Sequence, residues 1–401
     1  MNRYLMGGAV GVALTIAFVW GAGMLRVGSA GLPGEVGSGT VGEAGSVGTG
    51  GTADGGGAAG GAAEEEDPAL YDGPYVFWSG EDVAYVGSIC GDSATFETHE
   101  TQADGRLQFT DPCAPEHSYK ISAAAPQLEP AELEGGRRIF AVSDVEGNLD
   151  ELLVLLRAAG VVDESGRWAW GDGRLVFVGD MVDRGDQVTE VLWYVHQLEP
   201  QALDAGGRIH IVLGNHDAML LYNDDRYADD KYKLVAPKFR ASLSSLYGPS
   251  TELGRWLRTK PTILRIGEVL FVHGGVSDQL VQSGLDLEGV NDAIRLGLDE
   301  PWRTRTPGTL QMLFGSDGPL WYRGYFREEE LGTEQISSAL ATYGAEKVVV
   351  GHTIVESLER LHDGVVFGID VTFTDADLVE GLLIEEGRFY RVDAQGQVSP
   401  L

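Results

Sequence analysis

Polar residues that could bind metal ions or transfer protons follow short apolar runs in this 401-residue chain. Five such runs are typical of buried strands, and they span residues 139–142, 174–178, 209–213, 269–272 and 347–350. The polar positions after them include Asp144, Glu146, Asp180, Asn215, His273 and His352. Ligands bind outside the carboxyl ends of strands in layered α/β folds, so we expect these side chains to lie together.

The six residues supply three carboxylates, one amide oxygen and two imidazoles. This mixture suits two divalent or mixed-valence ions such as Mn²⁺, Fe or Zn²⁺. It does not suit Ca²⁺, which prefers shells made only of oxygen. Two such ions about 3.5–4 Å apart can share a bridging carboxylate and a bridging hydroxide. That hydroxide can attack phosphorus in line, so the pattern predicts phosphoester hydrolysis.

Five short motifs occur in a fixed order, each after an apolar run. They are Asp144, Gly179-Asp180-x-x-Asp183-Arg184-Gly185, Gly214-Asn215-His216-Asp217, His273-Gly274-Gly275 and Gly351-His352. This order resembles the calcineurin-like metallophosphoesterases. The second motif resembles the phosphoprotein phosphatase branch, especially its bacterial Shewanella-like members. The resemblance covers about residues 137–392.

The resemblance implies a role for each residue. Asp144 and residue 146 would bind the first ion, Asp180 would bridge, and Asn215, His273 and His352 would bind the second ion. His216 would protonate the leaving alcohol, with Asp183 orienting it. Arg184 and Asn215 would contact the substrate, and Arg323 in Leu320-Trp-Tyr-Arg-Gly-Tyr325 is the candidate for a second phosphate arginine. Mn²⁺ is the first candidate metal, with Fe or Zn²⁺ as alternatives.

Glu146 departs from the family, which usually has His at this position. A third carboxylate would reduce the net positive charge around the ions and favour harder ions such as Mn²⁺. Alternatively, Glu146 lies outside the first ligand shell.

The implied fold is α/β, an αββα sandwich of two mixed sheets over residues 136–395. A small β domain over 68–130 and an N-terminal hydrophobic helix would precede it. Within the β domain we expect strands at 75–78 and 83–86. Asp104-Gly105 predicts a hairpin turn between strands at 95–98 and 106–109.

The N-terminal region predicts export from the cytoplasm. Leu5 to Leu25 is 21 residues without a charge, long enough for a membrane anchor over residues 1–27. A cleavable signal peptide is the alternative, with small residues Val27/Ser29 or Gly28/Ala30 near a cut site. A glycine-rich tether over 28–67 follows. Both alternatives place the body in the cell envelope or outside the cell, where Cys90 and Cys113 are expected to form a disulfide.

Net charge limits the choice of substrate. At −32 the chain should repel nucleic acid. A phosphorylated protein is the first candidate substrate, by family resemblance alone. The alternatives are a small phosphoester or a dinucleoside polyphosphate and, from another class, a non-catalytic envelope binding protein. Residues 222–260 carry eight basic and five acidic residues and form either a surface that attracts phosphates or an ordinary solvated cap.

Overall fold

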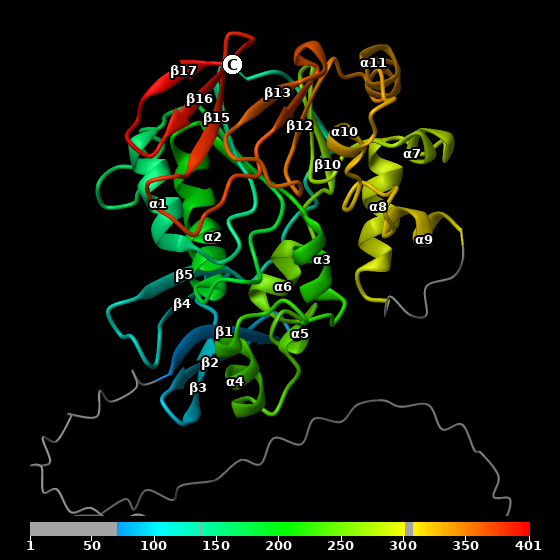
Figure 1. Ribbon diagram of the computed structural model, residues 1–401. Coiled ribbons are helices and arrows are strands. Elements are labelled where there is room, and N and C mark those ends of the chain that lie inside the picture. Colours follow the sequence, from blue (N-terminus) through cyan, green and yellow to red (C-terminus); the bar gives the residue numbers. More distant parts are fainter. Residues whose placement is uncertain (1–69, 137, 301–307) are drawn as a thin grey trace, which may run out of the picture. The chain divides into compact units, whose positions relative to one another are not determined.

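Two six-stranded sheets pack face to face at the centre of this computed structural model, which describes residues 70–136, 138–300 and 308–401 (Figure 1). The first sheet has the order β17 (Val398–Pro400), β16 (Arg388–Asp393), β15 (Glu380–Glu385), β7 (Arg138–Val142), β8 (Arg174–Val178) and β9 (Arg208–Val212). The second has the order β13 (Glu359–Leu361), β14 (Val366–Gly368), β12 (Lys347–Val350), β11 (Val269–Val272), β10 (Ile263–Ile266) and β6 (Glu132–Leu133).

Both sheets are mixed, as predicted. Strands β7, β8 and β9 are parallel to one another, whereas β15 runs antiparallel to β7. In the second sheet β12 is parallel to β11 and β14, whereas β10 is antiparallel to β11. The five apolar runs singled out in the sequence are β7, β8, β9, β11 and β12, so their carboxyl ends deliver the motifs.

Alternating side chains of each strand build two cores. In β7, Ile139 and Ala141 point into the core between the sheets, where they join Phe271 of the second sheet. Phe140 and Val142 belong to the core that the helices cover. This alternation follows from the two-residue period of a strand. Each fully buried valine, isoleucine or phenylalanine side chain contributes about 1.5–3 kcal/mol to the free energy of folding through burial.

Helices cover the outer faces of the two sheets. Helices α1 and α2 lie beside the first sheet, and α7, α8 and α11 lie beside the second (Figure 1). The α-helices are α1 (Leu149–Ala158), α2 (Val188–Asp204), α3 (Asn215–Leu221), α4 (Asp230–Lys238), α5 (Leu243–Leu246), α6 (Glu252–Leu257), α7 (Asp278–Gln282), α8 (Leu287–Gly297), α9 (Thr309–Leu313), α10 (Gly324–Arg327) and α11 (Thr333–Thr342). A 3-10 turn, η2, spans His362–Gly364.

Five strands precede the two six-stranded sheets and pack against their helices. They are β1 (Tyr71–Ser79), β2 (Val83–Cys90), β3 (Ser93–Glu100), β4 (Arg106–Thr110) and β5 (Ser118–Ser122). The Trp78 indole donates to Glu252 of α6 at 2.6 Å, and the Trp193 indole of α2 donates to the Pro74 carbonyl at 2.7 Å. The β1–β5 strands therefore share the same compact unit as the two six-stranded sheets.

The predicted pairing across Asp104-Gly105 is wrong. A turn forms there, but β3 pairs with β2, and β4 pairs with β5 in a separate two-stranded sheet. Aromatic pairing accounts for the partner of β4, because Phe109 stacks on Tyr119 of β5 with ring centroids 5.2 Å apart. The predicted disulfide between Cys90 and Cys113 is present, with Cα atoms 5.5 Å apart.

The predicted anchor and tether, residues 1–67, lie outside the described residues. Within the described ranges, no helix is both long enough and apolar enough to cross a membrane.

Candidate active site

Three predicted metal ligands meet where the two sheets adjoin. Asp180 follows β8, His273 follows β11 and His352 follows β12. One ligand atom from each of these residues lies within 4.8 Å of the others, and all three side chains are buried. Asn215, which follows β9, also reaches this cluster through His273, so four sequence-distant strand ends converge as expected.

Second-sphere hydrogen bonds orient these ligands. The His273 Nδ1–H donates to the Val178 carbonyl at 2.8 Å, which directs Nε2 toward Asn215 Oδ1 and Asp180 Oδ2, each 3.0 Å away. Burial opposes a charged imidazole, but Asp180 and Asp144 raise the pKa of His273 to about 10. A backbone carbonyl that holds one ring nitrogen while the other faces carboxylates is the usual arrangement of a metal-binding histidine.

His352 gives a test of whether these residues fit a metal ion. Its Nε2 atom is buried and has no hydrogen-bond partner in the described part of the chain. Burial, His273 and Arg323 lower the pKa of His352 to about 2, so the imidazole is neutral at pH 7 and one ring nitrogen keeps its lone pair. A buried ring nitrogen without a partner is costly unless it binds something. The donor set therefore fits a cation.

Asp144 adjoins the same cluster. Its Oδ2 accepts from the Ser143 hydroxyl at 2.5 Å and from the His352 backbone N–H at 3.1 Å. Burial raises the pKa of Asp144, and the nearby His273 imidazole lowers it. The two sheets thus contribute to one site, since Asp144 follows β7 and His352 follows β12.

Glu146 is found next to both the cluster and the phosphate arginine. Its carboxylate lies within 4.8 Å of Asp180 and His216, which form a second group of candidate ligands. The same carboxylate pairs with the Arg184 guanidinium. Glu146 is therefore near enough to serve an ion, but its charge also acts on Arg184.

His216 and Asp183 form a buried pair at the N-terminus of α3. The His216 Nδ1 atom lies 2.9 Å from Asp183 Oδ2, and Nε2 lies 3.8 Å from Asp180 Oδ2. Burial opposes the charged ring, but Asp180 and Asp183 raise the pKa of His216 above its usual value. A protonated imidazole whose free N–H faces the ligand cluster is suited to general acid catalysis.

Asp217 supports this loop instead of facing the cluster. Its carboxylate accepts the backbone N–H groups of Asp180, Met181 and Gly214 at 2.8–3.1 Å. These bonds join the end of β8 to the start of α3. They explain how Asp180 and His216 keep their relative positions. The His216 backbone N–H also donates to Asp180 Oδ1 at 2.8 Å.

The backbone is strained where the ligands lie. Six of the ten predicted site residues have φ values between 49° and 72°, a region that non-glycine residues rarely adopt. They are Asp144, Glu146, Asp180, Asp183, Arg184 and His352. Each such residue costs about 1–3 kcal/mol, and this strain is concentrated at functional sites.

Two glycines allow the close approach. A Cβ atom at Gly351 would overlap the Ser143 hydroxyl and the Asp144 carboxylate, and one at Gly214 would overlap the Asp180 carboxylate. The motifs therefore require glycine before His352 and Asn215 for reasons of space.

Arg323 is placed against His352 and not free in the cluster. Its guanidinium donates to the His352 carbonyl, and to Thr353 Oγ1 at 3.2 Å. Arg323 also lines a groove of about 480 Å³ together with Trp321 and Arg327. The Trp321 ring packs on His352 with centroids 5.5 Å apart, so this groove adjoins the metal-ligand cluster.

The basic residues of the 222–260 segment are neutralised locally. Seven of the eight form ion pairs with acidic residues: Arg226, Lys231, Lys233, Lys238, Arg255, Arg258 and Lys260. Lys260, for example, lies 2.6 Å from Glu199 and also pairs with Glu129. The structure favours the solvated cap over a surface that attracts phosphates.

Sequence reasoning missed two residues of the site. Asp370 follows β14 after Ile369 and is buried; burial and Asp144 raise its pKa to about 8. The search for polar residues after apolar runs could have found it, because β14 is part of another apolar run that is followed by a carboxylate. Tyr227 lies against His216 with ring centroids 5.0 Å apart, and nothing in its sequence neighbourhood marks it.

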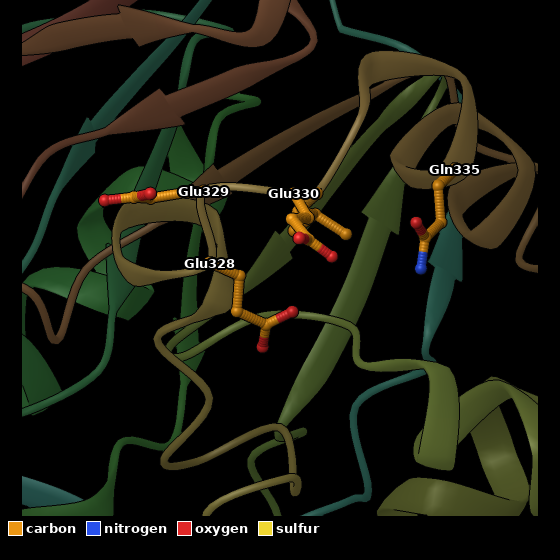
Figure 2. Close-up of a pocket in the computed structure, with 5 residues that line it drawn as sticks. Glu328, Glu329, Glu330 and Gln335 are labelled. Atoms are coloured by element: carbon orange, nitrogen blue, oxygen red, sulfur yellow. The ribbon is translucent and has the colours of Figure 1, made fainter.

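A second cavity lies apart from these ligands. Glu328, Glu329, Glu330, Leu331 and Gln335 line it, and its volume is about 440 Å³ (Figure 2). Figure 2 shows Glu329 pointing away from the other two carboxylates, with Gln335 reaching in from α11. None of the predicted site residues lines this cavity, so it is not the catalytic centre.

Comparisons with known proteins agree with this geometry. The calcineurin-like phosphoesterase family model matches residues 137–356. Shewanella-like protein phosphatase 2 of Arabidopsis thaliana is 26% identical over 270 residues, which cover 56% of this chain and 68% of that protein. The symmetrical bis(5′-nucleosyl)-tetraphosphatase of Methylococcus capsulatus is 36% identical over 138 residues, which cover 34% of this chain and 43% of that protein. The crystal structure of a cold-active protein-tyrosine phosphatase from a psychrophilic Shewanella species has a TM-score of 0.77 and 34% identity, and covers 82% of this chain and 99% of that one.

Proposed function

The chain belongs to the calcineurin-like phosphoesterase family and is a metal-dependent phosphatase, and we propose that its substrates are phosphorylated proteins. Two observations support this substrate class. The similar Arabidopsis protein and the similar Shewanella structure are both described as protein phosphatases. The groove beside His352 is lined by residues outside the ligand cluster, such as Trp321 and Arg327, which leaves room for a residue that flanks a phosphorylated side chain.

The observation that carries the phosphatase reaction is the His216–Asp183 pair beside the ligand cluster. Bound divalent ions would supply Lewis acidity and an activated water. We assign Asp144, Asp180, Asn215, His273 and His352 to holding these ions, with Glu146 at the edge of the set. Mn²⁺ is the first candidate because carboxylate oxygens form much of the donor set.

The remaining roles belong to the chain's own side chains. Arg184 is half exposed beside the cluster and would bind phosphate oxygens bidentately. His216 would donate its Nε2 proton to the leaving oxygen, while Asp183 holds the ring through Nδ1. Arg323 acts on His352 through its carbonyl, so we assign it to positioning that ligand and to lining the groove. A mere binding protein would need none of the Asp183, Arg184 and His216 set.

We also propose that the body works in the cell envelope or outside the cell, anchored by residues 1–27 or released after cleavage. The Cys90–Cys113 disulfide supports this, because disulfides persist in oxidising compartments. Alkaline extraction of membranes would separate the two forms. An anchored chain stays in the pellet, and a cleaved chain is recovered in the soluble fraction with a new N-terminus.

The test of the proposed reaction is hydrolysis by the full chain after metal removal and reloading with Mn²⁺, Fe or Zn²⁺. We expect turnover of phosphopeptides only with metal present, and its loss in Asp180→Asn. Diadenosine tetraphosphate is offered in parallel, since one of the similar proteins is described as a dinucleoside tetraphosphatase. Preference for it over every phosphopeptide would refute the protein substrate but not the metallophosphatase.

A further inference from the structure

Glu146 places a carboxylate among the groups that would surround a substrate phosphate. Its carboxylate pairs with the guanidinium of Arg184, the proposed phosphate arginine. One oxygen of the same carboxylate lies within 4.8 Å of a carboxylate oxygen of Asp180 and of a ring nitrogen of His216. Glu146 therefore adjoins the phosphate arginine, a metal ligand and the general acid at the same time.

The backbone fixes Glu146 in this position. Its N–H donates to the Asp180 carbonyl at 2.9 Å, and its carbonyl accepts the Gly185 N–H at 2.8 Å. These two bonds join Glu146 to the loop that carries Arg184. The Glu146 side chain is 15% exposed, whereas the Arg184 side chain is 48% exposed. The guanidinium is thus held by a mostly buried carboxylate and still has a face open to an incoming anion.

A carboxylate and a phosphate compete for a guanidinium because both offer it two oxygen acceptors in the same forked geometry. Glu146 carries one negative charge at neutral pH, and a phosphoester carries about 1.5 to 2. A phosphate that binds Arg184 must either displace the Glu146 carboxylate or lie next to it as a second anion. Both outcomes weaken phosphate binding.

We propose that Glu146 is an internal competitor for phosphate. It pairs with Arg184 in the empty site, lowers the affinity for phosphoesters and for the phosphate product, and so favours product release. This inference rests on the proposed phosphatase function and concerns the regulation of the same site. A histidine at this position could not act in this way, because an imidazole is never an anion at neutral pH.

The test measures the affinity of inorganic phosphate for the full chain loaded with Mn²⁺. Inhibition of p-nitrophenyl phosphate hydrolysis gives Ki, and calorimetric titration gives Kd without turnover. The variants are Glu146→Gln, which keeps the length of the side chain, Arg184→Gln, and the two combined. Bound Mn²⁺ is measured in each variant.

Asp224→Asn is the matched control. It removes one negative charge, as Glu146→Gln does, but Asp224 accepts from Arg226 at 2.8 Å. The Arg226 and Arg184 guanidinium groups both lie within 6.0 Å of the centre of the Tyr227 ring, so the control charge is in the same region. Asp224→Asn therefore changes the charge of this region without releasing Arg184.

We expect Glu146→Gln to bind phosphate about 5-fold more tightly than wild type, or better. One unit charge about 4 Å away changes affinity by that factor even at the dielectric constant of water. Asp224→Asn should stay close to wild type. The effect of Glu146→Gln should shrink when Arg184 is already glutamine, because the guanidinium for which the two anions compete is absent.

Three results would overturn the proposal. An unchanged phosphate affinity in Glu146→Gln would show that the carboxylate does not compete. An undiminished effect in the Arg184→Gln background would show that Glu146 does not act through this arginine. Weaker phosphate binding together with loss of Mn²⁺ would show that Glu146 holds an ion instead. A wild-type chain that hydrolyses no phosphoester with any metal would contradict the proposed function, and calorimetry would still measure the competition, so the two failures are distinguishable.

Discussion

Lys231→Met should destabilise the protein strongly, because Lys231 is the cation of a mostly buried charge cluster. Its Nζ atom lies 3.1 Å from Asp72 Oδ1, 3.0 Å from Glu190 Oε1 and 2.6 Å from the Asp186 carbonyl. Asp72 on β1 is fully buried. Removing the cation leaves that carboxylate without its charge partner, which costs about 3–5 kcal/mol for a buried pair. Whole domains are stable by only about 5–15 kcal/mol.

The predicted loss depends on pH with a definite sign. Burial raises the pKa of Asp72, whereas Lys231 lowers it. Without Lys231 the folded-state pKa rises further above the unfolded value, so the ionised carboxylate opposes folding at neutral pH. Lys231→Met should therefore regain stability relative to wild type as pH falls from 7 toward 5. Adding Asp72→Asn should restore much of the loss at pH 7, because the unpaired charge is removed.

The assay is urea denaturation of the full chain, in which tryptophan fluorescence reports unfolding. Lys233→Met is the matched control, since Lys233 lies on the same helix and pairs at 2.9 Å with Asp230 where both side chains are exposed. We expect no measurable change there. The reasoning would be refuted if Lys231→Met and Lys233→Met unfolded at the same midpoint urea concentration with an unchanged m value.

The same substitution should also affect catalysis. Lys231 and the Tyr232 hydroxyl both donate to the Asp186 carbonyl, two residues after Arg184. Loss of the ammonium loosens this loop, so KM for phosphoesters should rise more than kcat falls. Lys231→Arg, which keeps the charge, should restore most of the affinity. A lower kcat with an unchanged KM would instead indicate that the substitution only reduces the amount of folded enzyme, which is a purely structural role.

Three further predictions concern the site and its support. His216→Ala should lower kcat for an alkyl phosphate by about 100-fold or more and for p-nitrophenyl phosphate by much less, because a good leaving group does not need the acid; equal losses would contradict the assigned role. Gly351→Ala should abolish metal binding measured by calorimetry, because a methyl group there overlaps the Asp144 carboxylate; wild-type affinity would contradict the packing argument. Burial opposes the charges of Lys260 and Glu129, but attraction to Glu199 and Glu129 raises the pKa of the lysine above its ordinary value, and Lys260 lowers the pKa of Glu129. The advantage of wild type over Lys260→Met in urea should therefore be full between about pH 5 and pH 10 and shrink as pH falls below about 4; an advantage that does not shrink below about pH 4 would contradict it.

The ligand positions could be predicted from the sequence because a buried strand that ends in a polar residue is a strong local signal. Asp180 and His273 each follow an apolar run of four or five residues, and within each sheet the parallel neighbour, β7 beside β8 and β12 beside β11, brings a further ligand to the same edge. The pairing of β4 could not be predicted in this way. The turn at Asp104-Gly105 is local, whereas the choice of partner depends on the contact between Phe109 and Tyr119 across the two strands.

Charged residues show the limit of sequence reasoning more clearly. The excess of basic residues in the 222–260 segment is real, yet partners from other elements, such as Asp72 for Lys231 and Asp299 for Arg258, neutralise it. Those partners are 159 and 41 residues distant in sequence (231 − 72 and 299 − 258), so no local count of charges could include them. Tyr227 was missed for the same reason, since its importance comes only from the side chains beside it.

Glu146 is a residue whose position was predicted from the sequence but whose ion-pair partner was not. Charge counting treated it as a third carboxylate acting on the metal ions, which would weaken their Lewis acidity. In the structure it pairs with Arg184 as well as lying near Asp180. A carboxylate that neutralises the phosphate arginine competes with the substrate phosphate for the same guanidinium. The departure from histidine at this position therefore bears on how tightly phosphate is held, and not only on which metal is bound.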